Sequence, residues 1–267
     1  MGIRLFFLKK HNRNSLTEKN KYQTVRLVMV VAIALTMFGC NKENAPDCFQ
    51  SAGEVTTVKR NIDSFDILEL RDYVQIELYD TSTFFVEITA PRNLISDIST
   101  EVRDNKLKIE NRNTCNFVRS FKNRVHVRIY APRFSNIQNY STGNVSCVNV
   151  ISDPIFKIEN RNAAGTIDLH IDADTATVAT HTGVCDVKVR GTSLITNLFN
   201  QGLGTVNARE LITTDAFVNN SSINDVFVNC NGYFFAFIAF SGNVYYNGNP
   251  NYIDRDIQGD GKLIAIN

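Results

Sequence analysis

The 267-residue sequence has no Trp, only 4 His and only 5 Pro. Beyond the basic leader, His126, His170 and His181 lie far apart in the chain, without the paired spacing of zinc ligands. No C-x-x-C, H-E-x-x-H or calcium-loop pattern occurs. We therefore expect no bound metal ion and no other cofactor.

A long hydrophobic run is also missing. The apolar stretch from Leu27 to Phe38 is shorter than the roughly 20 residues that a membrane-spanning helix needs. It follows a leader with seven basic residues and one acid, and it ends in Met37-Phe38-Gly39-Cys40. A basic segment, a short apolar run and a small residue form the layout of a secretory signal. The last four residues resemble the lipobox of bacterial lipoproteins, in which the peptide is cut before a Cys that is then acylated.

We therefore expect residues 1–39 to be a signal peptide, Cys40 to carry a lipid, residues 40–47 to form a tether and residues 48–267 to form one domain. The lipid would hold the exported protein at the outer membrane, on the periplasmic side or at the cell surface. A plain secretory signal with an incidental Cys, or an uncleaved anchor, is the alternative. Because the leader holds seven of the 28 basic residues but only one of the 27 acids, the exported part is acidic, and we expect no nucleic-acid partner.

Apolar residues in the domain alternate with polar ones, as in Val74-Gln-Ile-Glu-Leu78, and this pattern predicts strands. In the second half, an apolar residue follows each Gly- or Asn-rich turn at intervals of 18 to 22 residues: Val145, Ile167, Val187, Val206, Val226, Val244 and Leu263. This repeat predicts an all-β fold, a single-stranded right-handed parallel β-helix whose stacked coils share one core. A β-sandwich requires no such period, and propeller blades repeat at about 40 residues or more.

The residues between the core positions should point outward. One position past each repeat residue the sequence has Ser146, Asp168, Lys188, Asn207, Phe227 and Tyr245, and three positions past it Val148, His170, Arg190, Arg209, Asn229 and Asn247. If the register holds, Lys188, Arg190 and Arg209 form a basic patch beside an aromatic step of Phe227 and Tyr245. This is our candidate binding surface, suited to stacking on sugar rings. The simpler interpretation is a solvated strand face with two stray aromatic residues.

Two other stretches attract attention. His181, Cys185 and Asp186 are residue types of a catalytic triad, but their counterparts in other coils are Gly, Ser, Thr and Asn, so we interpret them as a drifted turn. We identify no catalytic residues. The segment Tyr233–Phe240 is apolar at both strand parities, which predicts a surface for self-association or docking unless the tail, residues 251–267, covers it.

Several weak motifs together resemble the head GIN domain family of auto-transporter adhesins, common as lipoproteins of Bacteroidetes-type bacteria. They are Phe65-x-x-Leu68, Val74-Gln-Ile-Glu-Leu-Tyr79, the stretch Val102–Ile109, and the turns Thr142-Gly-Asn-Val145 and Ser241-Gly-Asn-Val244. The resemblance covers about residues 48–267. It implies a right-handed β-helix and an adhesin-like role without an established activity.

The resemblance also suggests a disulfide. Family members carry an N-terminal Cys and a later Cys-Asn-aromatic-Val-Arg stretch, which Cys48 and Cys115 match here. An exported protein meets an oxidising compartment in which such a pair can form. Beyond Cys40 the cysteines are odd in number, so at least one of them has no partner within the chain.

The function that these observations favour is a non-catalytic, lipid-anchored envelope or surface protein. We expect an adhesin-like scaffold that binds a glycan or a protein partner. The alternative is a polysaccharide-processing β-helix enzyme, which would need a pair of carboxylates facing one groove.

Overall fold

The computed structural model describes residues 52–113 and 125–266, together with Arg26 and Met29. The chain divides into two units, Met1–Gln50 and Ser51–Asn267, and the second carries its own hydrophobic core. Cys40, Cys48 and Cys115 lie outside the described residues, so the lipid and the disulfide stay predictions. Within the part that is described, no helix is both long enough and apolar enough to cross a bilayer.

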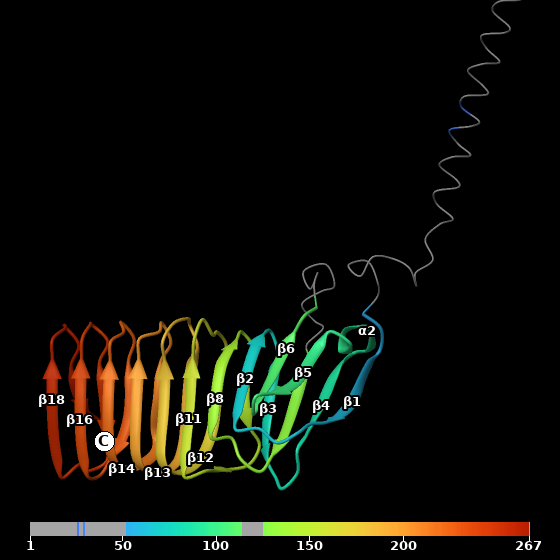
Figure 1. Ribbon diagram of the computed structural model, residues 1–267. Helices are drawn as coiled ribbons and strands as arrows, with labels where there is room; N and C mark the ends of the chain where they lie inside the picture. Colours follow the sequence, from blue (N-terminus) through green and yellow to red (C-terminus); the bar gives the residue numbers. More distant parts are fainter. Residues whose placement is uncertain (1–25, 27–28, 30–51, 114–124, 267) are drawn as a thin grey trace, which may run out of the picture. The chain divides into compact units, whose positions relative to one another are not determined.

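Strands make up almost all of the described domain, and they run in two faces that we call sheet A and sheet B (Figure 1). In spatial order, sheet A contains β5 (Ile98–Arg103), β6 (Lys106–Asn111), β2 (Ile67–Asp72), β8 (Asn136–Ser141), β11 (Ile155–Asn160), the second halves of β12 (Thr166–Thr180), β13 (Asp186–Asn200) and β14 (Val206–Asn220), then β16 (Tyr233–Ile238) and β18 (Tyr252–Ile257).

Sheet B lies behind sheet A in the view of Figure 1. In spatial order it contains β1 (Val55–Asn61), β4 (Phe85–Pro91), β7 (His126–Ala131), β3 (Gln75–Asp80), β9 (Val145–Cys147), the first halves of β12, β13 and β14, then β15 (Val226–Cys230), β17 (Val244–Asn247) and β19 (Leu263–Ala265). The short β10 (Ile151–Ser152) pairs with β12 near the bend between the sheets.

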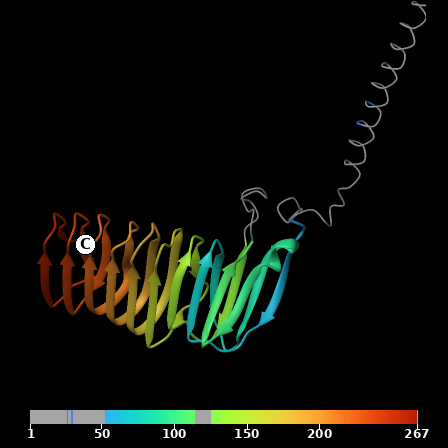
Figure 2. The same cartoon turned by 45° about the horizontal axis from the view of Figure 1, so that its top comes forward.

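One coil illustrates why the sequence folds this way. In β12, Ile167, Leu169 and Ile171 are buried and alternate with polar residues, so one face of the strand packs against the core and the other faces solvent. The strand bends near Asp174, continues in sheet A with a buried Ala176, and ends in a turn. The next coil repeats the path in parallel, and Figure 2 shows the successive coils side by side.

The repeat expected from the sequence is confirmed. The residues of its first column pair from coil to coil, from Val145 through Ile167, Val187, Val206, Val226 and Val244 to Leu263. All of them are buried except Leu263, which is partly buried in the last coil. The prediction of an all-β parallel β-helix is therefore correct.

The N-terminal end departs from the repeat. The coil made by β2 and β3 lies between the β6–β7 and β8–β9 coils, out of chain order. β1 pairs with β4, β4 with β7 and β5 with β6, all antiparallel, and the helical turn α2 (Arg92–Ile95) lies beside them. Arg60 donates to the carbonyls of Ile95 and Ile98 at 2.9 and 2.6 Å. These elements cover the end of the stack, which would otherwise expose core residues.

A ladder of polar side chains is buried where the sheet A strands end. Asn139, Asn160, Thr180, Asn200 and Asn220 occupy matching positions in successive coils and are all at most 2% exposed. The Asn139 amide donates to the Asn160 side chain at 2.9 Å, and the Thr180 hydroxyl to the Asn200 side chain at 2.7 Å. These bonds satisfy groups that burial would otherwise leave without partners.

Three cysteines of the described domain are free: Cys147, Cys185 and Cys230. Burial raises the pKa of all three thiols, that of Cys185 to about 12, so each stays protonated and poorly reactive at neutral pH. Their surroundings are those of buried hydrophobic residues and not of catalytic thiolates.

We expect a thiol count that reflects these three cysteines and the Cys48–Cys115 pair. Protein comprising residues 48–267, denatured without reductant, should yield three reactive thiols, and five after reduction. A chromogenic thiol assay on both samples measures this. Equal counts in the two samples would rule out the disulfide.

Candidate binding surface on the C-terminal coils

The first outward column of sheet B has the predicted register. Asp168 pairs with Lys188, Lys188 with Asn207, Asn207 with Phe227 and Phe227 with Tyr245. These side chains therefore lie in one line across five coils. The sequence spacing is sufficient to place Lys188, Phe227 and Tyr245 on the same face.

The second outward column is corrected by the structure. Arg190 pairs with Glu210 and not with Arg209, because the pairing of β13 with β14 shifts after Lys188. A β-bulge inserts an extra residue on one strand, so positions beyond it no longer match by counting. Arg209 lies in this irregular segment, and its guanidinium carbon is 5.3 Å from the ring centroid of Phe227.

Two of the three cations of the surface, Lys188 and Arg190, are paired with carboxylates, so the surface is not simply basic. Lys188 lies 2.8 Å from the Glu210 carboxylate, and Arg190 forms an ion pair with Asp168. The hydrogen bond from Lys188 lowers the pKa of Glu210. The sequence analysis missed Glu210 because the bulge brings it opposite Arg190. The resulting surface has charges of both signs held in fixed places.

The aromatic step exists, but its ring faces are partly occupied. The rings of Phe227 and Tyr245 stack with centroids 4.9 Å apart and an angle of 12° between their planes. Arg209 lies over the Phe227 ring. A sugar ring that stacked on Phe227 would have to displace one of these neighbours. The surface offers ring edges, a tyrosine hydroxyl and charged groups more readily than it offers open ring faces.

A groove lies at the bend between the two sheets, next to this surface. Its volume is about 360 Å³, and it is lined by Asp172, Ala173, Asp174, Thr192, Ser193, Leu194, Ile212, Thr213, Thr214 and Asn231. Asp172 pairs with Thr192, and Thr192 with Ile212, so three consecutive coils contribute equivalent positions. The groove was not predicted from the sequence. Its only signal is that short, mostly polar residues recur where one sheet turns into the next.

The groove combines hydrogen-bonding and apolar side chains. The Thr192 hydroxyl donates to the Asp172 carboxylate at 2.5 Å, which orients both groups. Leu194 and Ile212 are 57% and 54% exposed and supply apolar surface. Asp172 and Asp174 place two carboxylates in one groove, the feature that the enzyme alternative requires. Among the described residues, no group of three potential ligands is placed to hold a metal ion.

The trio His181, Cys185 and Asp186 does not form a site. The His181 imidazole lies 3.5 Å from the Glu159 carboxylate, in the neighbouring coil. Cys185 is buried, and the Asp186 carboxylate accepts a bond from the backbone N–H of Thr205 at 2.8 Å. The three side chains have separate structural roles in a turn, as the repeat predicts.

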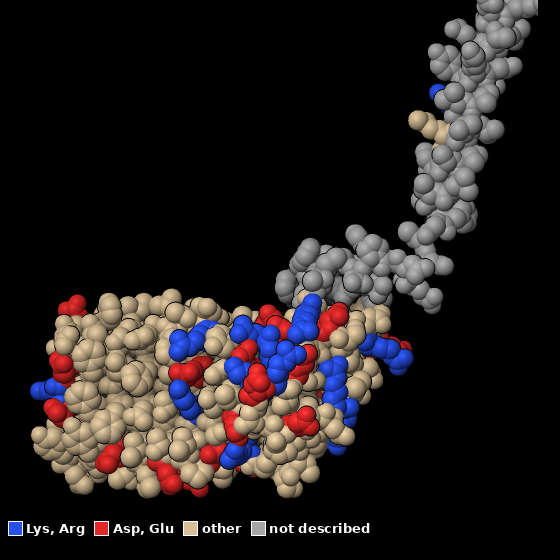
Figure 3. All heavy atoms as spheres, in the orientation of Figure 1, with Lys and Arg blue, Asp and Glu red and all other residues tan. Residues whose placement is uncertain are grey.

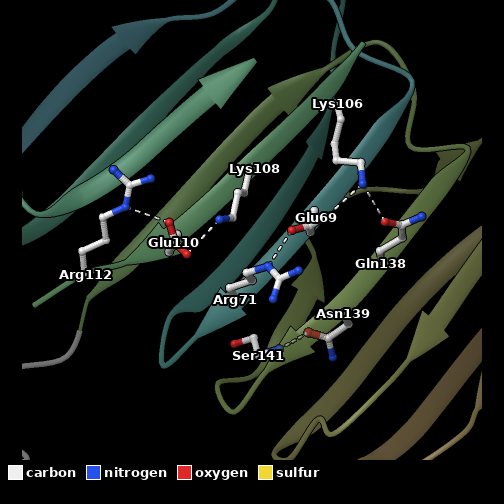
Figure 4. A network of polar contacts seen from close by, with 9 residues as sticks. All are labelled: Glu69, Arg71, Lys106, Lys108, Glu110, Arg112, Gln138, Asn139 and Ser141. Carbon is white, nitrogen blue, oxygen red and sulfur yellow. Dashed lines mark hydrogen bonds and ion pairs between the residues drawn. The ribbon is translucent and has the colours of Figure 1, made fainter. Parts of the chain in front are cut away.

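The other half of sheet A carries a network of ion pairs. Glu69 contacts Arg71 and Lys106 at 2.6 and 2.9 Å, and Lys106 also donates to Gln138 at 3.2 Å (Figure 4). Burial acts to raise the pKa of Glu69, but the bonds from Lys106 and Arg71 outweigh it, and the pKa is lowered. Because these charges satisfy one another, we regard this area as a structural surface.

Comparison with known proteins decides the family. The model of the family described as "Putative auto-transporter adhesin, head GIN domain" matches residues 64–250. The chain belongs to this family. The family description supports an adhesin-like role, in agreement with the resemblance found in the sequence. No curated protein matches this family member.

Solved structures agree on the fold. A putative adhesin from Bacteroides fragilis superimposes with a TM-score of 0.74 at 23% identity, covering 80% of this chain and 97% of its own. A putative adhesin from Parabacteroides distasonis gives a TM-score of 0.60 at 17% identity, covering 80% and 98%. A protein from the same species, described as a putative lipid binding protein, gives 0.59 at 16% identity, also covering 80% and 98%.

Proposed function

We propose that this family member is a non-catalytic adhesin, anchored by a lipid on Cys40 and exported to the outer membrane, that binds a glycan. The glycan would occupy the groove at the bend and extend over the adjoining face of sheet B. On that face it would meet Lys188, Arg190, Arg209, Phe227 and Tyr245. The coils act as a rigid support for these outward side chains.

One observation carries this proposal: three consecutive coils contribute side chains to the groove from equivalent positions. Coils stack at about 4.8 Å, so equivalent positions recur at a distance comparable to the rise of one sugar unit in an extended chain. Asp172, Asp174, Thr192 and Asn231 offer donors and acceptors for sugar hydroxyls. Leu194 and Ile212 offer apolar surface to the C–H faces of the rings. A protein ligand is the other class of partner, and the experiment below separates the two.

A binding screen tests the proposal. Residues 48–267, which contain the complete folded unit, are applied to a glycan array and to a panel of extracellular-matrix proteins. We expect a restricted set of glycans to bind and Asp174→Ala to weaken their binding at least tenfold. Asp63→Ala, an exposed aspartate between β1 and β2 and outside the groove, serves as the matched control and should bind as the unaltered protein does. Binding to matrix proteins alone would replace the glycan with a protein ligand.

The Asp172–Asp174 pair makes the enzyme alternative worth a direct test. Each glycan that binds is incubated with the protein, and its products are separated by chromatography. We expect the glycan to be recovered intact. Release of shorter products that Asp172→Asn abolishes would establish catalysis and overturn the non-catalytic assignment.

A lipid on Cys40 predicts in which cell fraction the protein is found. In a bacterial host that acylates lipoproteins, the protein should be found in the membrane fraction and incorporate labelled fatty acid. Cys40→Ser should abolish the labelling, because the thiol that receives the lipid is lost. Unchanged labelling in Cys40→Ser would show that the lipid is attached elsewhere.

A further inference from the structure

The outward face of sheet A carries a cluster of large apolar residues on three neighbouring strands, β13, β14 and β16, beside the small outward residues of β12. We call this surface the apolar face, and its large residues are Ile195, Phe199, Phe217, Tyr233, Phe235 and Phe237. Phe199 and Phe217 are 42% and 39% exposed. Figure 3 shows few charged atoms over these strands, whereas charged atoms are dense over β2, β6 and β8. A continuous apolar surface of this extent usually marks a contact.

The C-terminal tail does not cover the apolar face. β18 pairs edge to edge with β16, and β19 pairs in the same way with β17. The described residues of the tail therefore add one more coil to the stack and do not fold over it. The alternative in which the tail buries the outward side of Tyr233–Phe240 is contradicted.

Two rings of the apolar face, Phe217 and Tyr233, contact neighbouring rings. Tyr233 and Tyr252 stack with centroids 5.7 Å apart and an angle of 9°, and Phe217 and Tyr233 lie 5.7 Å apart at 46°. These contacts occupy part of the Tyr233 ring surface. A sugar would stack on an open ring face, whereas a second sheet packs against projecting edges and interleaves its side chains with them.

We propose that two copies of this chain associate through their apolar faces, sheet A against sheet A. The interface is independent of the glycan groove, which lies at the bend. The two copies would be related by a two-fold axis parallel to the strands. Such an axis reverses the strand order, so that β12 lies opposite β16 of the partner and β13 opposite β14.

Charges at the two borders of the apolar face fit this arrangement. The outward side of β11 carries Lys157 and Glu159, and Arg161 directly follows the strand and also contacts Glu159. The outward side of β18 carries Asp254 and Asp256. The reversed order places β11 of one copy opposite β18 of the other. The excess positive charge of one border then meets the negative charge of the other, twice per dimer. An arrangement that kept the strand order would oppose like charges.

The size of the surface suggests a weak dimer. Six strands at about 4.8 Å spacing, each about 20 Å long, give a flat footprint of roughly 600 Å². A standard interface buries about 800 Å² of accessible surface per partner. Since projecting side chains enlarge the accessible area beyond the footprint, the dimer falls at the low end of stable interfaces. We expect a micromolar dissociation constant.

Sedimentation velocity over a range of concentrations tests the proposal. Residues 48–267 should shift from monomer to dimer as concentration rises, and Phe217→Ser should weaken the dimer at least tenfold. Phe227→Ser removes the same ring from an outward position of sheet B and should leave the dimer unchanged. A protein that stays monomeric throughout, or equal dimers in the unaltered protein and Phe217→Ser, would overturn the proposal.

A charge exchange tests the orientation without removing any apolar side chain. Asp254→Lys combined with Asp256→Lys should weaken the dimer, and adding Lys157→Glu and Arg161→Glu should restore it. Failure of this restoration would overturn the reversed order.

A flotation assay with neutral phosphatidylcholine vesicles tests whether lipid, and not a second copy of the chain, covers the apolar face. Binding of monomeric protein to vesicles that Phe217→Ser abolishes would assign the apolar face to lipid and contradict the dimer.

Discussion

Gly183→Ala is expected to lower the free energy of unfolding by about 3 kcal/mol or more. Gly183 adopts φ +100, and a β-carbon there would lie 2.1 Å from the carbonyl oxygen of Ala163 in the preceding coil. A left-handed conformation costs a non-glycine residue about 1–2 kcal/mol, and overpacking typically adds about 1–3 kcal/mol. The same carbonyl accepts the N–H of Val184 at 3.0 Å, so moving it also weakens a bond between coils.

Thermal and urea unfolding of residues 48–267 measure this effect. Gly202→Ala is the matched control, because it lies in the equivalent turn of the next coil, has no positive φ, and its β-carbon would come no closer than 3.3 Å to Gly183. We expect the control to cost less than about 1 kcal/mol. Equal stability of Gly183→Ala and the unaltered protein would mean that the coils stack less closely at this turn than the structure indicates.

Asn220→Ala is expected to cost about 2–4 kcal/mol. The Asn220 side chain is fully buried, and its amide donates to the carbonyls of Asn224 and Asn243 at 3.0 and 3.2 Å. Removing the amide takes a donor from both carbonyls, and an unsatisfied buried group costs about 1–3 kcal/mol. The bonds join a strand end to the turn that follows it and to the next coil, so their loss should loosen the C-terminal coils.

Asn219→Ala provides the comparison. Asn219 precedes Asn220, points outward and accepts a bond from the Ser221 hydroxyl at 2.7 Å. It should cost less than about 1 kcal/mol by urea unfolding. Because solenoids can unfold in parts, both variants should be followed by two probes. Similar losses in the two variants would argue against a specific role for the buried ladder.

The features of the fold that follow from a regular repeat, namely the core positions and the outward columns, could be predicted from the sequence. Alternation placed Val187 and Val226 in the core, and counting from them placed Lys188, Phe227 and Tyr245 on one outward line. Both predictions succeed because, in parallel strands that pair in register, residues at equivalent positions point to the same face of the sheet.

Other features depend on pairings between distant parts of the chain, and counting could not predict them. The shift between β13 and β14 moves Arg209 out of line and brings Glu210 opposite Arg190. The insertion of the β2–β3 coil between later strands is invisible in a local pattern. The groove escaped notice because its lining residues are short and polar and resemble an ordinary bend.

The two proposed surfaces lie on different parts of the same coils. Glycan contacts are assigned to the bend and sheet B, and self-association to sheet A. A dimer would present two grooves and so raise the apparent affinity for a repeating glycan on a surface. This arrangement suits an adhesin, whose single contacts are weak and whose ligands are multivalent.

The most direct test of the account is the affinity of the groove for a glycan selected on the array. Calorimetric titration of residues 48–267 should give saturable binding, reduced at least tenfold by Asp174→Ala and unaffected by Asp63→Ala, with both variants as stable as the unaltered protein. Equal affinity of Asp174→Ala and the unaltered protein, or folded protein that binds no glycan at all, would contradict the account.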